Sequence, residues 1–322
     1  MSRFTPDPTS IASLQHKSVV LSGGANGIGA ASVKLFLERG CSVTFGDVTR
    51  ATGEELVGRL CKMCPQYASR IQFVLCDVSR YEDVVFLFKS ALDRFGSVDV
   101  AVSLAALTEI GNIFDPELDI ETVSRRRPTT TLVDVNLLGT LYFARVALAY
   151  LRHQDPQTPP VEHGRNDRKS LILVSSVAGF KESPGLFVYQ ATKHAVLGLM
   201  RSMRKYPPIT NSVRVNAVCP WMTLTGMVDG IRTRWREAGL PENAPEDVAR
   251  IITEIAAEQT LHGEAIYIEG GRGWCVDKGI DDTEPVWLGE KNSAELNRGQ
   301  VVLGDVSYMM CDETVDECLL SF

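Results

Sequence analysis

The 322-residue sequence lacks an excess of positive charge, an evident export signal and a long apolar run. Its formal net charge is −7 at pH 7, so no general attraction to nucleic acid is expected. Arg125–Arg127 is too short a run to change this; a solvated loop is its simplest interpretation, and contact with an acidic substrate is the alternative. Residues 1–8 lack the charged and apolar regions of a signal peptide, and no segment approaches the ~20 apolar residues of a membrane span. We therefore expect a cytoplasmic protein without a nucleic-acid partner or a membrane span.

A pattern of metal ligands is also missing. Eight cysteines are present, several within apparent strands, where a buried thiol is a small apolar filler that suits a reducing compartment. Cys61 and Cys64 have the spacing of a redox motif, but no second pair or histidine cluster accompanies them for zinc. His153 and His163 are interpreted as solvated. We expect no metal site.

The apolar residues that are present fall into seven short runs separated by helical patterns. Because most runs are continuously apolar, they predict parallel strands buried on both faces. The alternation indicates an α/β fold, a doubly wound parallel seven-stranded sheet of the Rossmann type, with ligands at the carboxyl ends of the strands. The predicted strands lie near residues 18–22, 42–47, 71–76, 99–104, 170–175, 213–218 and 265–269.

The alternation of strands and helices is unbroken to Gly271, which favours one domain. We divide the chain into an N-terminal arm (1–16), a catalytic domain (17–271) and a C-terminal extension (272–322). Residues 110–131 and 153–169 read as insertions, the second as a surface loop. From about Glu290 onward disorder is possible, although residues 300–303 and 318–322 are apolar enough to dock.

A glycine-rich turn follows the first predicted strand. Gly23 and Gly27 permit a tight turn with close backbone approach, and Gly29 lets the following helix pack on the strand, so that the helix N-terminus faces a pyrophosphate. Asp47 ends the second predicted strand, where an acidic residue can accept hydrogen bonds from a ribose diol. The pattern predicts a dinucleotide site that favours NAD(H) over NADP(H).

Tyr189 and Lys193 are four residues apart and therefore share one face of a helix. An ammonium beside a phenol favours the phenolate, which lowers a pKa that starts near ~10. Tyr189 is then a plausible proton donor or acceptor for hydride transfer to a carbonyl. Ser176 and Asn136, upstream, complete a set able to run proton chemistry on an alcohol or a ketone.

From about Lys17 to Gly271 the sequence resembles the short-chain dehydrogenase/reductase family, through the glycine-rich turn and the ordered Asn, Ser, Tyr and Lys. The resemblance implies that Tyr189 is the acid/base, that Ser176 binds the reacting oxygen, that Lys193 lowers the Tyr189 pKa and binds the nicotinamide ribose, and that Asn136 holds a relay water. It also implies a homodimer or homotetramer. By this resemblance the cofactor residues are Ser22, Gly23, Asn26, Gly27, Ile28, Gly29, Asp47, Asp77, Val78, Ala105, Tyr189, Lys193, Pro220 and Thr225.

Two segments depart from the family pattern. Ser103–Ala106 stands where the family usually has Asn-Asn-Ala-Gly, and Trp221 replaces a glycine. These departures put the detailed cofactor geometry in question and keep open a second hypothesis: a redox-inactive member that acts as a cofactor-binding scaffold or a cyclisation catalyst. The intact Asn, Ser, Tyr and Lys set favours the oxidoreductase.

The candidate substrate wall is apolar and aromatic. It comprises Leu107, Val177, Phe187 and Trp221. Such a wall favours a bulky hydrophobic substrate, because pockets gain affinity mainly from apolar contact. The aromatic start of the C-terminal extension is similar to that of fungal members of the family from secondary metabolism. We expect a polycyclic, terpenoid, polyketide or steroid-like alcohol or ketone.

Overall fold

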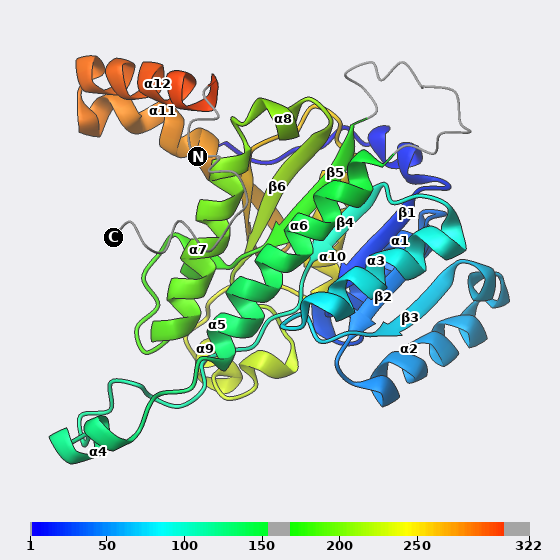
Figure 1. Ribbon diagram of the computed structural model, residues 1–322, viewed down its shortest axis with the longest axis horizontal. Coiled ribbons are helices and arrows are strands. Elements are labelled where there is room, and N and C mark those ends of the chain that lie inside the picture. The colour runs from blue at the N-terminus through cyan, green and yellow to red at the C-terminus, as the bar shows by residue number, and fades with distance from the viewer. Residues whose placement is uncertain (1, 154–167, 306–322) are drawn as a thin grey trace, which may run out of the picture.

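An eight-stranded sheet forms the centre of the computed structural model, which describes residues 2–153 and 168–305 (Figure 1). The strand order is β3-β2-β1-β4-β5-β6-β7-β8, and all pairings are parallel except that of β7 with β8. This is the predicted doubly wound α/β fold. The strands are β1 (Ser18–Ser22), β2 (Ser42–Asp47), β3 (Ile71–Leu75), β4 (Val100–Ser103), β5 (Lys169–Val174), β6 (Val213–Pro220), β7 (Ala265–Glu269) and β8 (Arg272–Cys275).

Helices cover both faces of this sheet. One face carries α1 (Gly27–Glu38), α2 (Arg50–Met63) and α10 (Pro245–Ala257). The other carries α3 (Tyr81–Phe95), α6 (Gly139–Arg152) and α7 (Phe187–Met203). The remaining described helices are η1 (Ser10–Leu14), η2 (Pro65–Ser69), α4 (Ile120–Arg125), α5 (Thr131–Val133), the π-helical η3 (Asp134–Leu138), η4 (Val177–Gly179), α8 (Pro207–Thr210), η5 (Gly226–Val228), α9 (Arg232–Glu237), α11 (Asp277–Leu288) and α12 (Glu290–Asp305).

The continuously apolar strands follow from this double cover. In β1, Val19 and Leu21 belong to the core beneath α1 and α10, whereas Val20 belongs to the core beneath α3 and α6. Successive side chains of a strand point to opposite faces, so a strand covered on both faces needs apolar residues at every position.

One helical stretch of the described residues, Thr131–Arg152, is long and apolar enough to cross a membrane by length and composition. Its α6 part packs against α3 and against strands β4 and β5. Phe143, Ala144 and Ala147 lie fully or almost fully buried in the core there. Packing in the core accounts for the apolar composition of this helix.

The sheet has one strand more than the sequence predicted. Gly270 and Gly271 both have positive φ, +54° and +70°, and return the chain so that β8 pairs antiparallel with β7. A two-residue hairpin loop with positive φ at both positions strongly favours glycine. The sheet therefore continues past Gly271, where we placed the end of the catalytic domain.

The N-terminal arm covers the outer edge of β8. Phe4 donates its backbone N–H to the Gly273 carbonyl at 2.9 Å, and Cys275 donates to the Ser2 carbonyl at 2.9 Å. An open strand edge presents unpaired backbone groups and invites pairing with another chain. The arm satisfies these groups within the same chain.

Helices α11 and α12 form a hairpin beyond β8, at the upper left of Figure 1. Glu284 of α11 accepts hydrogen bonds from Ser293 at 2.6 Å and from Asn297 at 2.8 Å, which join the two helices. Where the sequence suggested disorder from Glu290, the chain is helical to Asp305 because α11 supplies polar partners. Val301 and Val302 are exposed rather than docked, and residues 318–322 lie outside the described residues.

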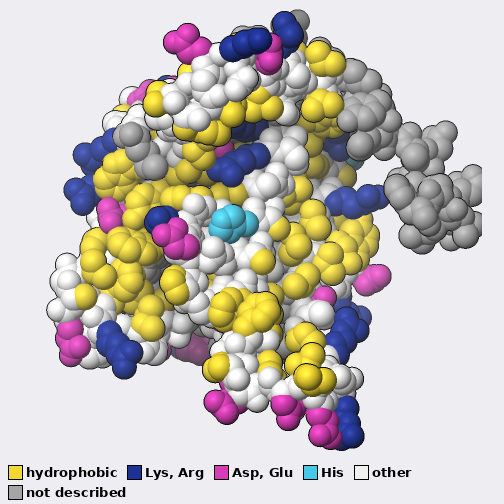
Figure 2. Space-filling model, turned by 90° about the vertical axis from the view of Figure 1, so that its left-hand side faces the viewer, with side chains coloured by type: hydrophobic (Ala, Val, Ile, Leu, Met, Phe, Trp, Pro, Cys, Tyr) yellow, Lys and Arg dark blue, Asp and Glu magenta, His cyan; other side chains and the backbone are white. Residues whose placement is uncertain are grey.

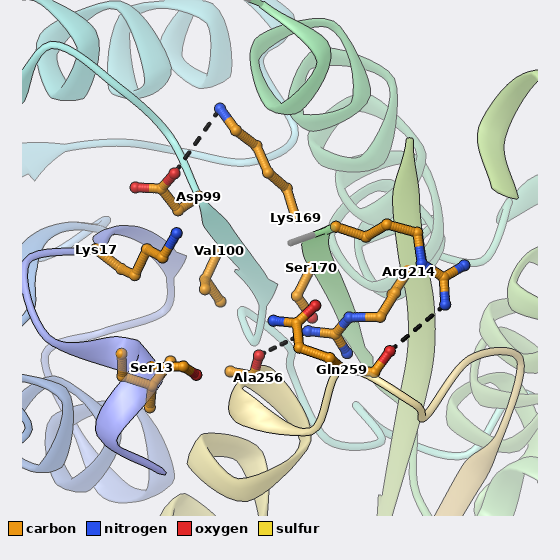
Figure 3. A pocket seen from close by; sticks show the side chains of 11 residues that line it. Ser13, Lys17, Asp99, Val100, Lys169, Ser170, Arg214, Ala256 and Gln259 are labelled. Carbon is orange, nitrogen blue, oxygen red and sulfur yellow. Dashed lines mark hydrogen bonds and ion pairs between the residues drawn. The ribbon is translucent and has the colours of Figure 1, made fainter. Parts of the chain in front are cut away.

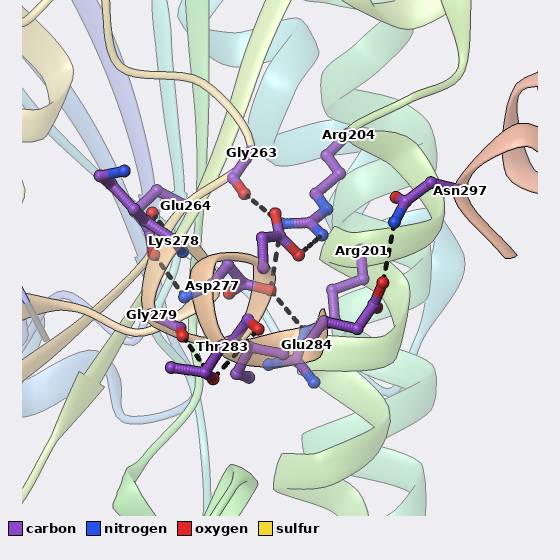
Figure 4. Close-up of polar contacts among 12 residues, drawn as sticks. Arg201, Arg204, Gly263, Glu264, Asp277, Lys278, Gly279, Thr283, Glu284 and Asn297 are labelled. Carbon is purple, nitrogen blue, oxygen red and sulfur yellow. Dashed lines mark hydrogen bonds and ion pairs between the residues drawn. The ribbon is translucent and has the colours of Figure 1, made fainter. Parts of the chain in front are cut away.

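A buried carboxylate attaches this hairpin to α7 (Figure 4). Asp277, only 2% exposed, accepts from Arg201 Nε at 2.7 Å and lies 3.3 Å from Arg204 Nη1. Glu264, which precedes β7, accepts the backbone N–H groups of Asp277 at 2.6 Å and Lys278 at 3.0 Å. A carboxylate at a helix N-terminus stabilises the first turn.

At the amino ends of the central strands, polar contacts join the starts of neighbouring strands (Figure 3). Asp99 accepts the backbone N–H of Ser18 at 2.8 Å and lies 3.8 Å from Lys169 Nζ. Arg214 is fully buried and donates to the carbonyls of Ile255 and Ala256 at the end of α10. A cation at a helix C-terminus offsets the partial negative charge there. These contacts secure the strands at the edge away from their carboxyl ends.

Residues 110–131 extend from the body as an arm that contains α4, at the lower left of Figure 1. Ile120 and Val123 of this arm are 86% and 61% exposed. The second predicted insertion, 153–169, lies mostly outside the described residues.

We predict that Asp277→Ala destabilises the fold by at least about 2 kcal/mol, because it leaves two arginines without their shared buried partner. Lys278→Ala is the matched control. Its pair with Asp282 is exposed on both sides, so its loss should cost less than about 1 kcal/mol. Urea unfolding measures both; equal effects for the two variants would contradict the role assigned to Asp277.

Candidate active site

The turn between β1 and α1 packs so closely that side chains are excluded. A Cβ on Gly29 would lie 2.0 Å from the Gly23 carbonyl oxygen, and one on Gly23, where φ is +69°, would lie 2.7 Å from the Ala105 Cα. Gly27 has φ +50°, and a Cβ there would lie 2.9 Å from Thr225 Cγ2. The predicted cofactor residues of the turn, of the β4 loop and of the segment after β6 are therefore neighbours.

The start of α1 is open to an anion. Asn26 precedes the helix, is exposed and, within the described residues, makes no side-chain capping bond to it. The first N–H groups of a helix lack intrahelical partners, and the helix dipole favours negative charge at this end. Ile28 lies in this first turn and packs against the core. These features fit a pyrophosphate.

Ser22 is the last residue of β1 and directly precedes this turn. It is fully buried, and its hydroxyl accepts the backbone N–H groups of Leu104 at 3.1 Å and Ala105 at 3.3 Å. We predicted a cofactor contact for Ser22. In the structure its side chain holds the loop after β4 against the turn, and the cofactor contact of Ser22 stays a prediction.

Asp47, at the end of β2, faces the same turn. Its Oδ2 accepts the Ala25 N–H at 3.0 Å, and its Oδ1 accepts the Thr49 N–H at 3.3 Å. Each carboxylate oxygen can accept more than one hydrogen bond, so these contacts leave capacity for ribose hydroxyls.

Asp77 and Val78 follow β3, beside the end of β2, where Cys76 donates its N–H to the Asp47 carbonyl at 3.0 Å. The Asp77 carboxylate accepts from Ser79 Oγ at 2.7 Å and Ser79 N–H at 3.0 Å. Val78 is only 5% exposed and contacts Gly139 so closely that a Cβ there would lie 2.7 Å from Val78 Cγ2. Both side chains shape this loop, and their contact with adenine stays a prediction.

Ser176, Tyr189 and Lys193 meet after the carboxyl end of β5. The Ser176 side chain lies close enough to the Tyr189 phenol to lower its pKa. The Ser176 hydroxyl also lies 3.5 Å from the Pro220 carbonyl oxygen, at the end of β6. Lys193 Nζ donates to the Val174 carbonyl at 3.0 Å and lies 5.6 Å from the centre of the Tyr189 ring.

Burial dominates the electrostatics of this group. It raises the pKa of Tyr189, and the hydrogen bond from Ser176 opposes that rise. Burial also lowers the pKa of Lys193 to about 8. The expected lowering of the Tyr189 pKa by Lys193 is not the leading effect in this structure, because a buried site disfavours the charged forms of both side chains.

Asn136 lies on the π-helical segment η3 and is fully buried. Its Oδ1 accepts the Leu107 N–H at 2.8 Å, and its Nδ2 donates to the Leu107 carbonyl at 2.9 Å and to Thr192 Oγ1 at 3.3 Å. Its own carbonyl accepts from Thr140 Oγ1 at 2.8 Å. Asn136 therefore ties the β4 loop to α7, and its role in a water relay stays a prediction.

The residues predicted to line a substrate pocket have different surroundings. Leu107 and Phe187 are 36% and 41% exposed, and Val177 is half-buried. Trp221 instead packs against Trp235 of α9, with ring centres 4.9 Å apart, and against Tyr267 of β7 at 6.4 Å. Hydrophobic side chains cover much of the side of the molecule shown in Figure 2.

Glu109 is a site residue that the sequence analysis missed. Its carboxylate accepts the Tyr189 N–H at 2.8 Å and the Val188 N–H at 3.3 Å, at the start of α7. A capping residue normally lies next to its helix in the sequence. Glu109 is 80 residues upstream of Tyr189, so no local pattern could reveal it.

We predict that Lys193→Met removes a pH-dependent contribution to stability. Because Lys193 has a lower pKa when folded, about 8 against 10.5, the wild-type protein gains stability as pH rises from about 8 to 10.5, by about 3 kcal/mol in total. The unfolding free energy of the variant should lack this rise with pH, and it should exceed that of wild type most at pH 8 and below. Unfolding free energies at pH 7, 8, 9 and 10 test this, and parallel curves for the two proteins would contradict it.

A doubly wound sheet with an anion-accepting glycine turn and a Ser, Tyr and Lys group at its carboxyl edge defines a nucleotide-dependent oxidoreductase. The short chain dehydrogenase family model matches residues 17–235. The chain belongs to this family, and the predicted membership is confirmed.

Named relatives extend this result to fungal proteins. The chain is 29% identical over 299 residues to the 5'-hydroxyaverantin dehydrogenase of Dothistroma septosporum, covering 87% of this chain and 92% of that protein. It is 30% identical over 275 residues to the short-chain dehydrogenase/reductase ascJ of Acremonium egyptiacum, covering 84% of each. The predicted resemblance to fungal members of secondary metabolism is confirmed.

Solved structures agree on the fold. The crystal structure of a Brucella melitensis short-chain dehydrogenase/reductase, titled glucose/ribitol dehydrogenase, matches with a TM-score of 0.65 and 24% identity, over 80% of this chain and 96% of that one. The predicted α/β fold class is confirmed, with the strand count corrected to eight.

Proposed function

We propose that this protein is an NAD(H)-dependent oxidoreductase that interconverts a secondary alcohol and a ketone on a bulky hydrophobic substrate. The observation that carries the proposal is the grouping of Ser176, Tyr189 and Lys193 after the carboxyl end of β5, where Ser176 acts on the Tyr189 pKa and Lys193 Nζ lies 5.6 Å from the centre of the Tyr189 ring. Two hydroxyl groups converging on one point suit the oxygen of an alcohol or carbonyl.

The dinucleotide site fits NAD(H). The close glycine turn and the uncapped start of α1 suit a pyrophosphate, and the Asp47 carboxylate suits a ribose diol. Arg50, the nearest cation downstream of Asp47, is engaged with Glu54 at 3.3 Å, so Asp47 remains the charge that would face a 2′-phosphate. When bound, the nicotinamide accepts or donates the hydride.

The residues of the chain supply the proton chemistry. During alcohol oxidation Tyr189 accepts the hydroxyl proton, and during ketone reduction it returns that proton to the oxygen. Ser176 donates a hydrogen bond that stabilises negative charge on the oxygen in the transition state. Lys193, held by the Val174 carbonyl, keeps a cation near the phenol and within reach of the nicotinamide ribose.

Exposed apolar groups near Tyr189 support a hydrophobic substrate. Leu107 and Phe187, the first residue of α7, are 36% and 41% exposed, and Phe114 packs edge-on against Phe187 with ring centres 4.9 Å apart. The name of the Dothistroma septosporum relative gives a hydroxylated substrate that is dehydrogenated. We propose a polycyclic, polyketide or steroid-like alcohol or ketone. The homodimer or homotetramer and the cytoplasmic location stay predictions.

We predict that Tyr189→Phe lowers turnover by at least about 100-fold, because general acid–base groups typically contribute 10²–10⁴-fold. Cofactor affinity should stay within about twofold, since the ring remains. Cofactor absorbance with a panel of polycyclic alcohols and ketones measures turnover, and fluorescence titration measures affinity. More than a tenth of wild-type turnover in the variant would contradict the role of Tyr189. A wild-type protein that binds cofactor but turns over no member of the panel would favour the redox-inactive alternative.

A preference for NAD(H) over NADP(H) should depend on the charge of Asp47. Asp47→Asn keeps an acceptor for the Ala25 N–H but removes the negative charge. We therefore expect the ratio of kcat/KM with NAD(H) to kcat/KM with NADP(H) to fall by about tenfold or more. Asp282→Asn, on exposed α11, is the matched control. Equal efficiency of wild-type enzyme with both cofactors would refute the assignment.

A further inference from the structure

The helix that carries Tyr189 is capped by a distant residue. Leu186, which precedes α7, has no polar side chain with which to cap it. Glu109 takes this place: Oε2 accepts the Tyr189 N–H at 2.8 Å and Oε1 accepts the Val188 N–H at 3.3 Å. The first amides of a helix need acceptors, and a carboxylate there also favours the helix dipole. One of the two amides held in this way belongs to Tyr189 itself.

Glu109 is itself held from both sides along the chain. Two residues before it, the Leu107 backbone makes a pair of hydrogen bonds to the Asn136 side chain, at 2.8 and 2.9 Å. Five residues after it, Phe114 packs against Phe187 of α7 with the rings at 84°. The segment from Leu107 to Phe114 therefore links Asn136 to the first turn of α7, with Glu109 at its centre.

This link has a consequence for proton transfer. The position of the phenol depends on where the Tyr189 backbone lies, and a displacement of about 1 Å can cost about 100-fold in rate. A site is productive only when its groups are held within about 0.5 Å of the required geometry. The Glu109 carboxylate holds the Tyr189 backbone nitrogen, which is bonded to the Cα that carries the side chain.

We propose that Glu109 is a positioning residue that fixes Tyr189 in its catalytic geometry through the backbone of α7. This inference rests on the proposed function, since it assumes that Tyr189 transfers the proton. Glu109 acts through Tyr189 and not on the substrate. Variation of this residue should therefore change kcat more than cofactor affinity.

The test compares Glu109→Ala, Glu109→Gln and Glu117→Ala. Glu117 is exposed on the same loop and serves as the matched control. For Glu109→Ala we expect kcat to fall by about 10- to 100-fold, with cofactor Kd within about twofold of wild type. Glu109→Gln retains one acceptor oxygen, so its kcat should lie between those of wild type and Glu109→Ala. The control should match wild type.

A spectroscopic measurement provides a readout that does not depend on turnover. With tyrosines labelled at the ring carbon that bears the hydroxyl, the signal of Tyr189 is assigned by its loss in Tyr189→Phe. We expect this signal to move in Glu109→Ala, because the position of the phenol relative to Ser176 changes, and to stay in place in Glu117→Ala. If Glu109→Ala does not fold, Glu109→Gln decides by the same two measurements.

The outcomes separate this inference from the proposed function. A Tyr189→Phe variant that keeps more than a tenth of wild-type turnover would refute Tyr189 as the acid/base, the part of the proposed function on which this inference rests. An inactive Tyr189→Phe beside a Glu109→Ala variant with wild-type kcat and an unmoved Tyr189 signal would overturn only the role of Glu109. A parallel loss of cofactor affinity and kcat in Glu109→Ala would also overturn it, since that pattern indicates general damage to the fold.

Discussion

The absence of room for a side chain at Gly29 is the constraint on which the site depends. With the Gly23 carbonyl where a Cβ would stand, α1 can begin directly above the end of β1. The same close packing brings Gly23 onto Ala105 and Gly27 onto Thr225. Segments that follow three different strands therefore meet around one turn, and the groups that suit a dinucleotide need no further element to assemble them.

Burial of the proton-transfer group is the second constraint, and it acts against the charges that chemistry requires. Lys193 is only 3% exposed, with its ammonium on the Val174 carbonyl, and burial is the main cause that lowers its pKa to about 8. The same burial raises the pKa of Tyr189. Burial therefore favours the uncharged forms of both side chains, because desolvation lowers the pKa of a base and raises that of an acid.

The sequence revealed features whose cause is local. The continuously apolar runs predicted the buried strands, and the glycine turn and the four-residue spacing of Tyr189 and Lys193 predicted where the site lies. It did not reveal contacts between distant segments. These are the hydrogen bond of Ser22 to the loop after β4 and the capping of α7 by Glu109, which lies 80 residues upstream of Tyr189. The eighth strand was a different kind of error. Gly270 and Gly271 form a recognised hairpin signal, and taking Gly271 as the end of the domain concealed it.

The departures from the family pattern after β4 find their explanation in these distant contacts. Ser103 is a buried member of the strand, and the N–H groups that follow it have acceptors elsewhere. The Ser22 hydroxyl accepts the N–H groups of Leu104 and Ala105, and the Asn136 side chain accepts the N–H of Leu107. Backbone groups with such partners keep their positions even when the local side chains change. The loop can then differ in sequence without losing its register on the glycine turn, and the longer stretch beyond it, from Glu109 to Phe114, makes its contacts with α7.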